Sequence, residues 1–580
     1  FEILFFPEIP LFCTALPYFG YGGYEVAHLN LGKHCTLVRN GLYFQYKDAS
    51  GDLVSEGRYI LKYLNTNRPQ ILFQQILNDT LYVDKSLMID TISKCISNAG
   101  RKYICITRPR RFGKTVNATM LAAYYTKGFD SRNLFDTLKI SSCASYQKHI
   151  NCYNVIHIDL SEMPDICESY QDYIKSIRKK IYKDLYTAFP QVDEDGYDSL
   201  NDLLLATDSS FVFILDEWDS IFYRDFVTAE DRNEYLRFLK NLLKDQPYVE
   251  LAYMTGVLPI AKYSSGSELN MFDEFNFMND NMFDSFFGFS KAEVEELCIQ
   301  HPAVPFSEVK RWYDGYYKSD GSSLFNPRSV SKALMRGACL NYWTETGPMN
   351  EIADCIEHNV DKVREDIVKM VAGIPVEVDL EGYSAAELQL DTRDEILSAM
   401  VVYGFLSYYD GKLTIPNHEL MEKYQKVLSR DSMGEVKEIV GRSKEMLEAT
   451  LACNSERVAQ LLEQAHDAEI PFLMYNDENS LSCVITLCYL YARKFYSILR
   501  EEKSGKGYCD YLFLPKNPGH PPVILELKVG KTPEDALEQI KAKNYLQRAE
   551  PYGRAVLVGI SYDKEKRHQC KIEKHSFSGK

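Results

Sequence analysis

Three adjacent residues, Gly113, Lys114 and Thr115, have the types and the order that bind the phosphates of a nucleotide. They follow a short apolar strand expected at 103–107 and a basic turn, and they open a helix. Glycine lets the backbone approach a ligand, lysine reaches a pair of phosphates, and the threonine hydroxyl can hold Mg²⁺. The free N–H groups at a helix start also attract an anion. We therefore expect a phosphate-binding loop here.

The first half of this loop departs from the usual pattern. Arg108 stands where such loops normally have glycine, and Pro109 removes a backbone donor. The alternative interpretation is a basic turn that contains Gly-Lys-Thr by chance. If the loop does bind phosphate, the guanidinium groups of Arg108, Arg110 and Arg111 can offset the lost donors. We therefore include all three among the expected ligand-binding residues.

Polar residues also follow two later apolar strands at their carboxyl ends. Asp216 and Glu217 come after a strand expected at 211–215, and Thr255 follows one expected at 250–254. The first acid can hold Mg²⁺, the second can polarise an attacking water, and the threonine can contact the γ-phosphate or that water. Each motif alone could be a solvated strand end. Together and in this order, they favour binding of a nucleotide with Mg²⁺.

A second charged group lies on a hairpin expected near the C-terminus. Its strands cover 508–514 and 523–529, and Asp510, Glu526 and Lys528 can point to one face of the sheet. Two carboxylates can hold Mg²⁺, and a lysine can position the nucleophile or stabilise developing charge. The alternative is the charged outer face of an amphipathic hairpin. The strands are otherwise apolar, however, and burying charges there is costly without a function. The pattern favours metal-dependent phosphodiester chemistry.

The elements that must position these residues indicate an α/β fold. Apolar strands expected at 103–107, 155–160, 211–215 and 250–254 alternate with helices of ten or more residues. Such alternation is typical of a parallel sheet with helices on both faces, and ligands bind such sheets at the carboxyl ends of the strands. After residue 270 the pattern becomes mostly helical, and Ser290 with Glu293 predicts a capping box at a helix start.

Composition limits the class of protein. The chain has 580 residues, of which 45% are hydrophobic and 26% charged, as expected for a soluble protein of several domains. No apolar run is long enough to span a bilayer, so we expect no membrane partner. The 15 cysteines are dispersed without any C-x-x-C, which favours free thiols and a cytoplasmic location. The net charge of −16 disfavours an extensive nucleic-acid-binding surface, but residues 501–580 carry 15 basic and 11 acidic residues.

Two parts of the chain resemble known families. One part is similar to the bacterial AAA-ATPase-like family, on the run Arg108 to Thr115 and on Tyr82-Val83-Asp84-Lys85, Val155 to Asp159, Leu215-Asp216-Glu217, Thr255-Gly256-Val257, Ser267 to Asn270, Trp312 to Tyr316, and Asn326-Pro327. The other is similar to the PD-(D/E)XK nuclease domain, on Asp510, Glu526-Leu527-Lys528, Gln539 and Val558-Gly559-Ile560-Ser561. The Arg-Pro of the loop is shared by similar family members.

These resemblances imply a P-loop NTPase fold, a nuclease fold and a set of nuclease residues. Asp510, Glu526 and Lys528 are implied as catalytic, with Glu478 as a further metal ligand and Gln539 beside them. Two departures stand out: Tyr508-Cys509 occupies a place where members often have arginine, and Trp218-Asp219-Ser220 replaces the usual Tyr-Asp-Lys. We divide the chain into an N-terminal extension of unknown role (1–69), an AAA-ATPase-like domain (70–290), a mostly helical region (291–470) and a nuclease-like domain (471–580).

Together with the two resemblances, the sequence predicts an ATP-binding and ATP-hydrolysing protein with a Mg²⁺-dependent nuclease domain. We expect the substrate to be DNA more than RNA and allow for a homo-oligomer. Lys114 and Thr115 would hold ATP and Mg²⁺, Asp216 would support the metal, Glu217 would activate water, and Thr255 would sense the γ-phosphate. The competing hypothesis is a nucleotide-switched scaffold whose nuclease-like domain binds nucleic acid or protein without cutting.

Overall fold

The computed structural model describes residues 61–577, except 193–195, 261–267, 277–279, 344–352, 357, 379–389, 431–434, 467–477, 505–506, 518, 544 and 563–566. It also describes five short strands nearer the N-terminus. Three of them form an antiparallel sheet: β1 (Leu16–Phe19), β2 (Glu25–Asn30) and β3 (His34–Val38). The other two pair with each other: β4 (Gln45–Lys47) and β5 (Leu53–Ser55).

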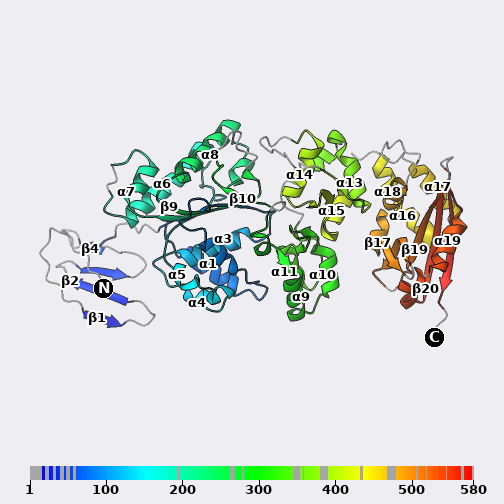
Figure 1. The fold of residues 1–580 in the computed structure, drawn as a ribbon, viewed down its shortest axis with the longest axis horizontal. Coiled ribbons are helices and arrows are strands. Elements are labelled where there is room, and N and C mark those ends of the chain that lie inside the picture. Colours follow the sequence, from blue (N-terminus) through cyan, green and yellow to red (C-terminus); the bar gives the residue numbers. More distant parts are fainter. Residues whose placement is uncertain are drawn as a thin grey trace.

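A parallel sheet of five strands follows, in the order β10-β6-β9-β8-β7 (Figure 1). Its strands are β6 (Tyr103–Thr107), β7 (Asn154–Asp159), β8 (Phe211–Asp216), β9 (Val249–Gly256) and β10 (Asp273–Phe275). Every neighbouring pair runs parallel, so all carboxyl ends meet at one edge of the sheet. The predicted parallel α/β fold is confirmed.

The two faces of this sheet are both apolar, which is why both are covered by helices. On β6, Ile104 and Ile106 pack on one side, while Tyr103 and Cys105 pack on the other. The first side is covered by α1 (Arg68–Leu77), α2 (Leu87–Ser93), α3 (Lys114–Tyr125), α4 (Arg132–Phe135) and α5 (Tyr146–His149). The second side is covered by α6 (Tyr170–Ala188), α7 (Leu200–Ala206) and α8 (Ala229–Leu243).

The outer edge of the sheet is closed by residues that precede the predicted start of this domain. Leu64 pairs antiparallel with Ile156 of β7, and the buried Asp184 of α6 accepts hydrogen bonds from the backbone N–H groups of Lys62, Tyr63 and Leu64. The core domain therefore begins a few residues before residue 70.

The middle region is mostly helical, as expected, and lies between the core and the C-terminal sheet (Figure 1). Its first part holds α9 (Lys291–Gln300), α10 (Phe306–Tyr313) and α11 (Pro327–Arg336) with a small sheet of β11 (Phe289–Ser290), β12 (Tyr316–Tyr317) and β13 (Ser323–Phe325). Its second part holds α13 (Val363–Val371), α14 (Arg393–Val402) and α15 (His418–Leu428) with β14 (Val376–Glu377), β15 (Ser407–Tyr409) and β16 (Lys412–Thr414). The predicted capping box of Ser290 and Glu293 is present at α9.

The C-terminal domain is a mixed sheet in the order β17-β18-β19-β20-β21. Its strands are β17 (Tyr496–Ser504), β18 (Gly507–Pro515), β19 (Val523–Val529), β20 (Arg554–Tyr562) and β21 (His568–Ser576). The predicted hairpin is the antiparallel pair β18–β19, and α19 (Pro533–Ala542) crosses over to β20, which lies parallel to β19. Three further helices join this domain: α16 (Glu435–Leu451), α17 (Ser455–His466) and α18 (Glu478–Cys488). The first two lie in the segment we had assigned to the middle region.

Gly559 of β20 allows α19 to pack directly on the sheet. A Cβ atom at this position would fall on the carbonyl oxygen of Pro533, in the first turn of α19, and 3.2 Å from Ala536 Cβ. Gly559 pairs with Glu526 in the strand register. The glycine therefore sets the distance between α19 and the strand that carries Glu526.

We predict that Gly559→Ala destabilises the C-terminal domain by about 1–3 kcal/mol, because added atoms at a tight backbone contact force α19 outward. A lower midpoint for thermal unfolding of this domain would show the effect. Gly519→Ala is the matched control, since no atom lies within 4 Å of a Cβ placed there. Equal melting of the two variants would contradict the packing argument.

Candidate active sites

A cavity of about 1080 Å³ lies at the carboxyl edge of the parallel sheet, between the core and α11. The predicted loop contributes Arg110, Arg111, Gly113, Lys114 and Thr115 to its wall. Asp159 and Glu217, at the ends of the adjacent strands β7 and β8, also line it. The cavity lies where parallel sheets bind their ligands.

The backbone of the loop fixes the position of the Lys114 ammonium. Gly113 has a φ of +93° and is the N-cap of α3, so a glycine is needed for the turn into the helix. The Lys114 ammonium is buried and donates to the carbonyl oxygens of Arg108 and Pro109, at 3.1 and 3.3 Å. It also lies 3.8 Å from a carboxylate oxygen of Glu217. The ammonium is thus oriented by the loop backbone.

The strand order brings the other predicted residues to this lysine. Because β9 lies between β6 and β8, Thr255 sits beside Asp216, and its hydroxyl donates to the Asp216 carboxylate. The same hydroxyl accepts the Glu217 backbone N–H at 3.4 Å. Burial raises the pKa of Asp216 to about 6, against the effect of the nearby Thr255 and Thr115 hydroxyls. One Asp216 oxygen is buried without a hydrogen bond from any described residue, which fits a ligand for a cation.

Asp219 is a supporting residue that the sequence showed only as a departure from a family pattern. Its carboxylate accepts the backbone N–H groups of Val257 and Leu258, at 3.0 and 2.8 Å, and burial raises its pKa to about 6. It thereby fixes the chain just after Thr255. Gly256 completes this arrangement, because a Cβ there would collide with the indole of Trp218.

Arg108 does not line the cavity, which corrects the expectation that three arginines face the phosphates. Its side chain is 2% exposed and forms an ion pair with the buried Asp280. It also donates to the carbonyl oxygen of Phe275 at 2.8 Å, and its guanidinium lies over the Phe287 ring. A guanidinium paired in this way is a structural anchor of the loop.

Arg110 and Arg111 do lie at the cavity, and a residue that we did not predict joins them. The pKa of the Arg111 guanidinium is lowered by partial burial and then by the positive charges of Arg328 and Arg110. Arg328 lies in the first turn of α11, and Arg328, Ser331, Lys332 and Met335 all line the cavity. Their spacing of three and four residues places them on one helix face. In the sequence, that spacing after Asn326-Pro327 was the signal from which these α11 residues could have been predicted.

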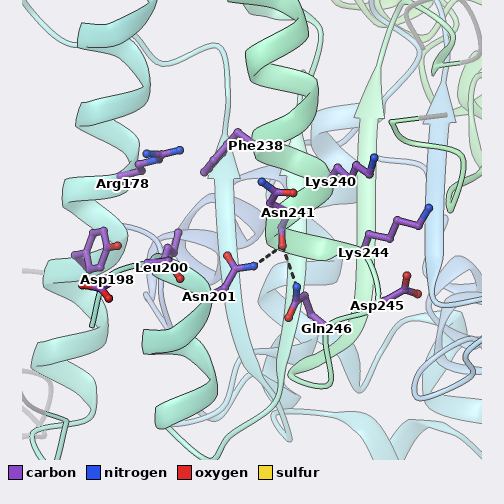
Figure 2. Close-up of a pocket in the computed structure, with 12 residues that line it drawn as sticks. Arg178, Asp198, Leu200, Asn201, Phe238, Lys240, Asn241, Lys244, Asp245 and Gln246 are labelled. Atoms are coloured by element: carbon purple, nitrogen blue, oxygen red, sulfur yellow. Dashed lines mark hydrogen bonds between the residues drawn. The ribbon is translucent and has the colours of Figure 1, made fainter. Parts of the chain in front are cut away.

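A second cavity, of about 560 Å³, lies between α6, α7 and α8 (Figure 2). Arg178, Lys240 and Lys244 line it, but Lys240 pairs with Glu268 and Lys244 donates to Asn270. Asp245 and Gln246 lie just before β9, so this cavity is near the amino end of that strand. None of the residues predicted to bind ligand lines it, and we assign it no chemistry.

The residues predicted on the hairpin converge on one face of the C-terminal sheet. Glu526 is 1% exposed, and its carboxylate accepts from the Lys528 ammonium at 2.8 Å and from the side-chain amide of Gln539 of α19. Its other oxygen accepts the Asp510 backbone N–H at 3.4 Å, and the Asp510 carboxylate accepts the Leu527 N–H at 2.7 Å. Burial, and then the Asp510 charge, raise the pKa of Glu526, while Lys528 opposes both.

Among the described side chains, this face of the C-terminal sheet presents two carboxylates to a metal, those of Asp510 and Glu526. No group of three or more His, Cys, Asp or Glu side chains is arranged around a common point in that part of the chain. The predicted third ligand, Glu478, begins helix α18, but its side chain lies outside the described residues. Asp510 and Glu526, with Lys528 beside them, have the donor set for a hard cation such as Mg²⁺.

We predict that Asp216→Asn stabilises the ligand-free protein at pH 8 by about 1–3 kcal/mol, because the buried charge is removed. The folded pKa of about 6 lies above the ordinary 3.8, so the contribution of the protonated carboxyl is complete below pH 4 and is lost as pH rises through 6. The gain measured by thermal unfolding should therefore shrink between pH 8 and pH 5. Asp198→Asn, at an exposed site, is the control. A gain that does not change with pH would contradict this account.

Comparison with known proteins finds a family match for each of two segments of the chain. Residues 72–265 match the family described as predicted AAA-ATPase, and residues 476–572 match the PD-(D/E)XK nuclease superfamily. No curated protein matches the chain. No helix in the described part of the chain is long and apolar enough to cross a membrane.

Similar solved structures include the Walker-type ATPase PABY2304 of Pyrococcus abyssi, with 13% identity, a TM-score of 0.31, and coverage of 59% of this chain and 96% of that one. The Aeropyrum pernix ORC2 protein in ADPNP–ADP complexes has 13% identity, a TM-score of 0.31, and coverage of 61% and 97%. Drosophila ORC bound to DNA has 11% identity, a TM-score of 0.26, and coverage of 61% and 91%. By the two family matches, the chain carries an AAA-ATPase-like domain followed by a C-terminal PD-(D/E)XK nuclease superfamily domain.

Proposed function

We propose that the protein binds and hydrolyses ATP in the cavity at the carboxyl edge of the core sheet, and that its C-terminal domain is a Mg²⁺-dependent nuclease acting on DNA. The observation that carries the first half is the meeting of Lys114 at the start of α3 with Asp216 and Glu217 at the end of β8 and Thr255 of β9. The second half rests on the buried Glu526 with Asp510, Lys528 and Gln539 around it.

At the ATP site, each residue has a distinct task. Lys114 would neutralise the terminal phosphates, and Gly113 would let the backbone approach them. Thr115 and Asp216 would hold Mg²⁺, which supplies charge neutralisation for the phosphates. Glu217 would polarise the attacking water, and Thr255 would orient it from the neighbouring strand. The burial of Asp216 keeps its carboxylate poorly solvated until a cation is available.

The rest of the cavity fits the other parts of a nucleotide. Apolar side chains from α1 and α11 line it, including Leu72, Ile76 and Met335, and would surround the base. Arg110 and Arg111 from the loop and Arg328 from α11 line the same cavity and would contact the phosphates. An ATP molecule would therefore join the core to the middle region.

At the nuclease site, Asp510 and Glu526 would hold Mg²⁺, which supplies charge for the scissile phosphate. Lys528 would orient the nucleophile or stabilise developing charge at that phosphate. Gln539 fixes one Glu526 oxygen, so the carboxylate has a defined orientation.

The free thiols among the described cysteines fit a cytoplasmic setting. The competing function, a scaffold that binds without cutting, is favoured only by the net charge of −16.

We predict that Arg328→Gln weakens ATP binding about fivefold, as expected for the loss of a charge-assisted hydrogen bond worth ~1 kcal/mol at a partly exposed site. Equilibrium titration with ATP and Mg²⁺ measures this, with Lys114→Ala as the strongly impaired reference. Arg336→Gln is the matched control, because Arg336 lies at the other end of α11 over the Tyr342 ring. Wild-type affinity in Arg328→Gln would remove α11 from the ATP site.

We predict that Asp510→Asn and Lys528→Ala each lower the cleavage rate about 100-fold or more, because each removes a group that acts on the reacting phosphate. The assay compares single-stranded DNA, double-stranded DNA and RNA oligonucleotides at increasing Mg²⁺. Glu534→Gln is the control, since Glu534 pairs with Lys571 on the domain surface. Cleavage that persists in Asp510→Asn would refute the nuclease assignment, and binding without cleavage by the wild type would support the scaffold.

A further inference from the structure

The unusual residues of the phosphate loop face the middle region. Pro109 is buried, and a Cβ placed on Gly404 would lie 2.7 Å from the Pro109 Cβ atom. Phe112 is also buried, and its ring meets the Tyr316 ring edge-on with centroids 5.0 Å apart. Gly404 follows α14 and Tyr316 lies in β12, so one short loop contacts both parts of the middle region.

These two contacts form one surface. The Tyr316 hydroxyl donates to the carbonyl oxygen of Gly404 at 2.9 Å, which links β12 to the end of α14. The backbone of the loop adds a third link, because the Phe112 carbonyl oxygen accepts the N–H of Gly288 at 3.2 Å. Pro109 and Phe112 flank Arg110 and Arg111, which line the cavity. If Arg110 and Arg111 shift toward bound phosphates, Pro109 and Phe112 shift with them. The contacts of Pro109 with Gly404 and of Phe112 with Tyr316 would therefore change.

A second set of contacts connects the middle region to the C-terminal domain. The last carbonyl oxygens of α13, at Val371 and Ala372, accept hydrogen bonds from Arg493 and Arg500, at 3.4 and 3.3 Å. Cations at a helix C-terminus are electrostatically favoured. Arg500 lies on β17 directly opposite Tyr511, and Tyr511 is adjacent to Asp510. The contact with α13 is thus one strand away from the proposed nuclease site.

From these contacts we propose that Pro109 and Phe112 are a mechanical joint, through which nucleotide binding at the loop repositions the middle region and changes the β17–β18 part of the nuclease site. The inference rests on the proposed ATP binding and names how that site regulates the second one. It also explains the composition of the loop. Arg110 and Arg111 line the ligand cavity, whereas Pro109 and Phe112 pack against the middle region. The packed α13–α14 and α13–α15 pairs connect the two ends.

The test uses the full-length protein and a conservative variant of the joint, Tyr316→Phe, which keeps the ring against Phe112 but loses the hydrogen bond to Gly404. The matched control is Tyr313→Phe, in the same aromatic turn, where the lost hydrogen bonds are with the backbone of Leu340 and the ring packs in the apolar cluster of α9, α10 and α11. Hydrogen–deuterium exchange with and without ATP and Mg²⁺ is followed in residues 363–373 and 496–504, and ATP affinity is titrated in parallel.

In the wild type and in Tyr313→Phe, we expect ATP to change exchange in both segments. In Tyr316→Phe we expect ATP affinity to stay within about twofold while that change is roughly halved or lost, since the coupling and not the binding is removed. Arg500→Gln should keep the ATP-dependent change in 363–373 and lose it in 496–504.

Three results would overturn the joint while leaving ATP binding intact. They are an ATP-bound wild type with unchanged exchange in both segments, a full response in Tyr316→Phe, and an equal loss in the two tyrosine variants. A wild type that fails to bind ATP would instead refute the proposed function, and the joint would fall with it. The parallel titration separates these two failures.

Discussion

The ion pair between Arg108 and Asp280 fixes the Gly113-Lys114-Thr115 loop, on which the proposed ATP site depends. Removing a guanidinium from water is costly unless its N–H groups are paired, and Arg108 is paired with Asp280 and with backbone carbonyl oxygens. With the side chain turned inward, the Arg108 and Pro109 carbonyl oxygens point to the Lys114 ammonium. The anchored arginine therefore holds the loop in the conformation that directs these two carbonyl oxygens at Lys114.

Local patterns in the sequence predicted the elements well, but they could not predict the partners of buried side chains. The strand at 103–107 and the hairpin with Asp510 and Glu526 were confirmed, because apolar runs and alternation are local signals. The Arg108 side chain was wrongly expected to face the phosphates, because its partner Asp280 lies 172 residues further along the chain. The role of Arg328 was missed for the same reason: only the tertiary fold brings α11 to the cavity.

Domain boundaries show a similar limit. The sequence pattern predicts α16 and α17 as part of one long helical segment. It does not indicate which sheet these helices cover. In the structure they pack with the C-terminal sheet, and the N–H of Ile572 on β21 donates to the Ser455 hydroxyl at the start of α17. The carboxylates, in contrast, stood out in the sequence, because a charge on an apolar strand is costly without a partner. Asp216 and Glu526 are both buried acids with raised pKa values, each near a lysine.

The most direct measurement is an experimental structure of the protein with Mg²⁺ and a non-hydrolysable ATP analogue. We expect the triphosphate at Gly113, Lys114 and Thr115, the metal at Thr115 and Asp216, and Arg111 and Arg328 turned to the phosphates. We also expect that Arg108 stays on Asp280 while the contacts of Pro109 and Phe112 with Gly404 and Tyr316 shift. A nucleotide bound elsewhere, or Arg108 released from Asp280 to contact a phosphate, would contradict this account.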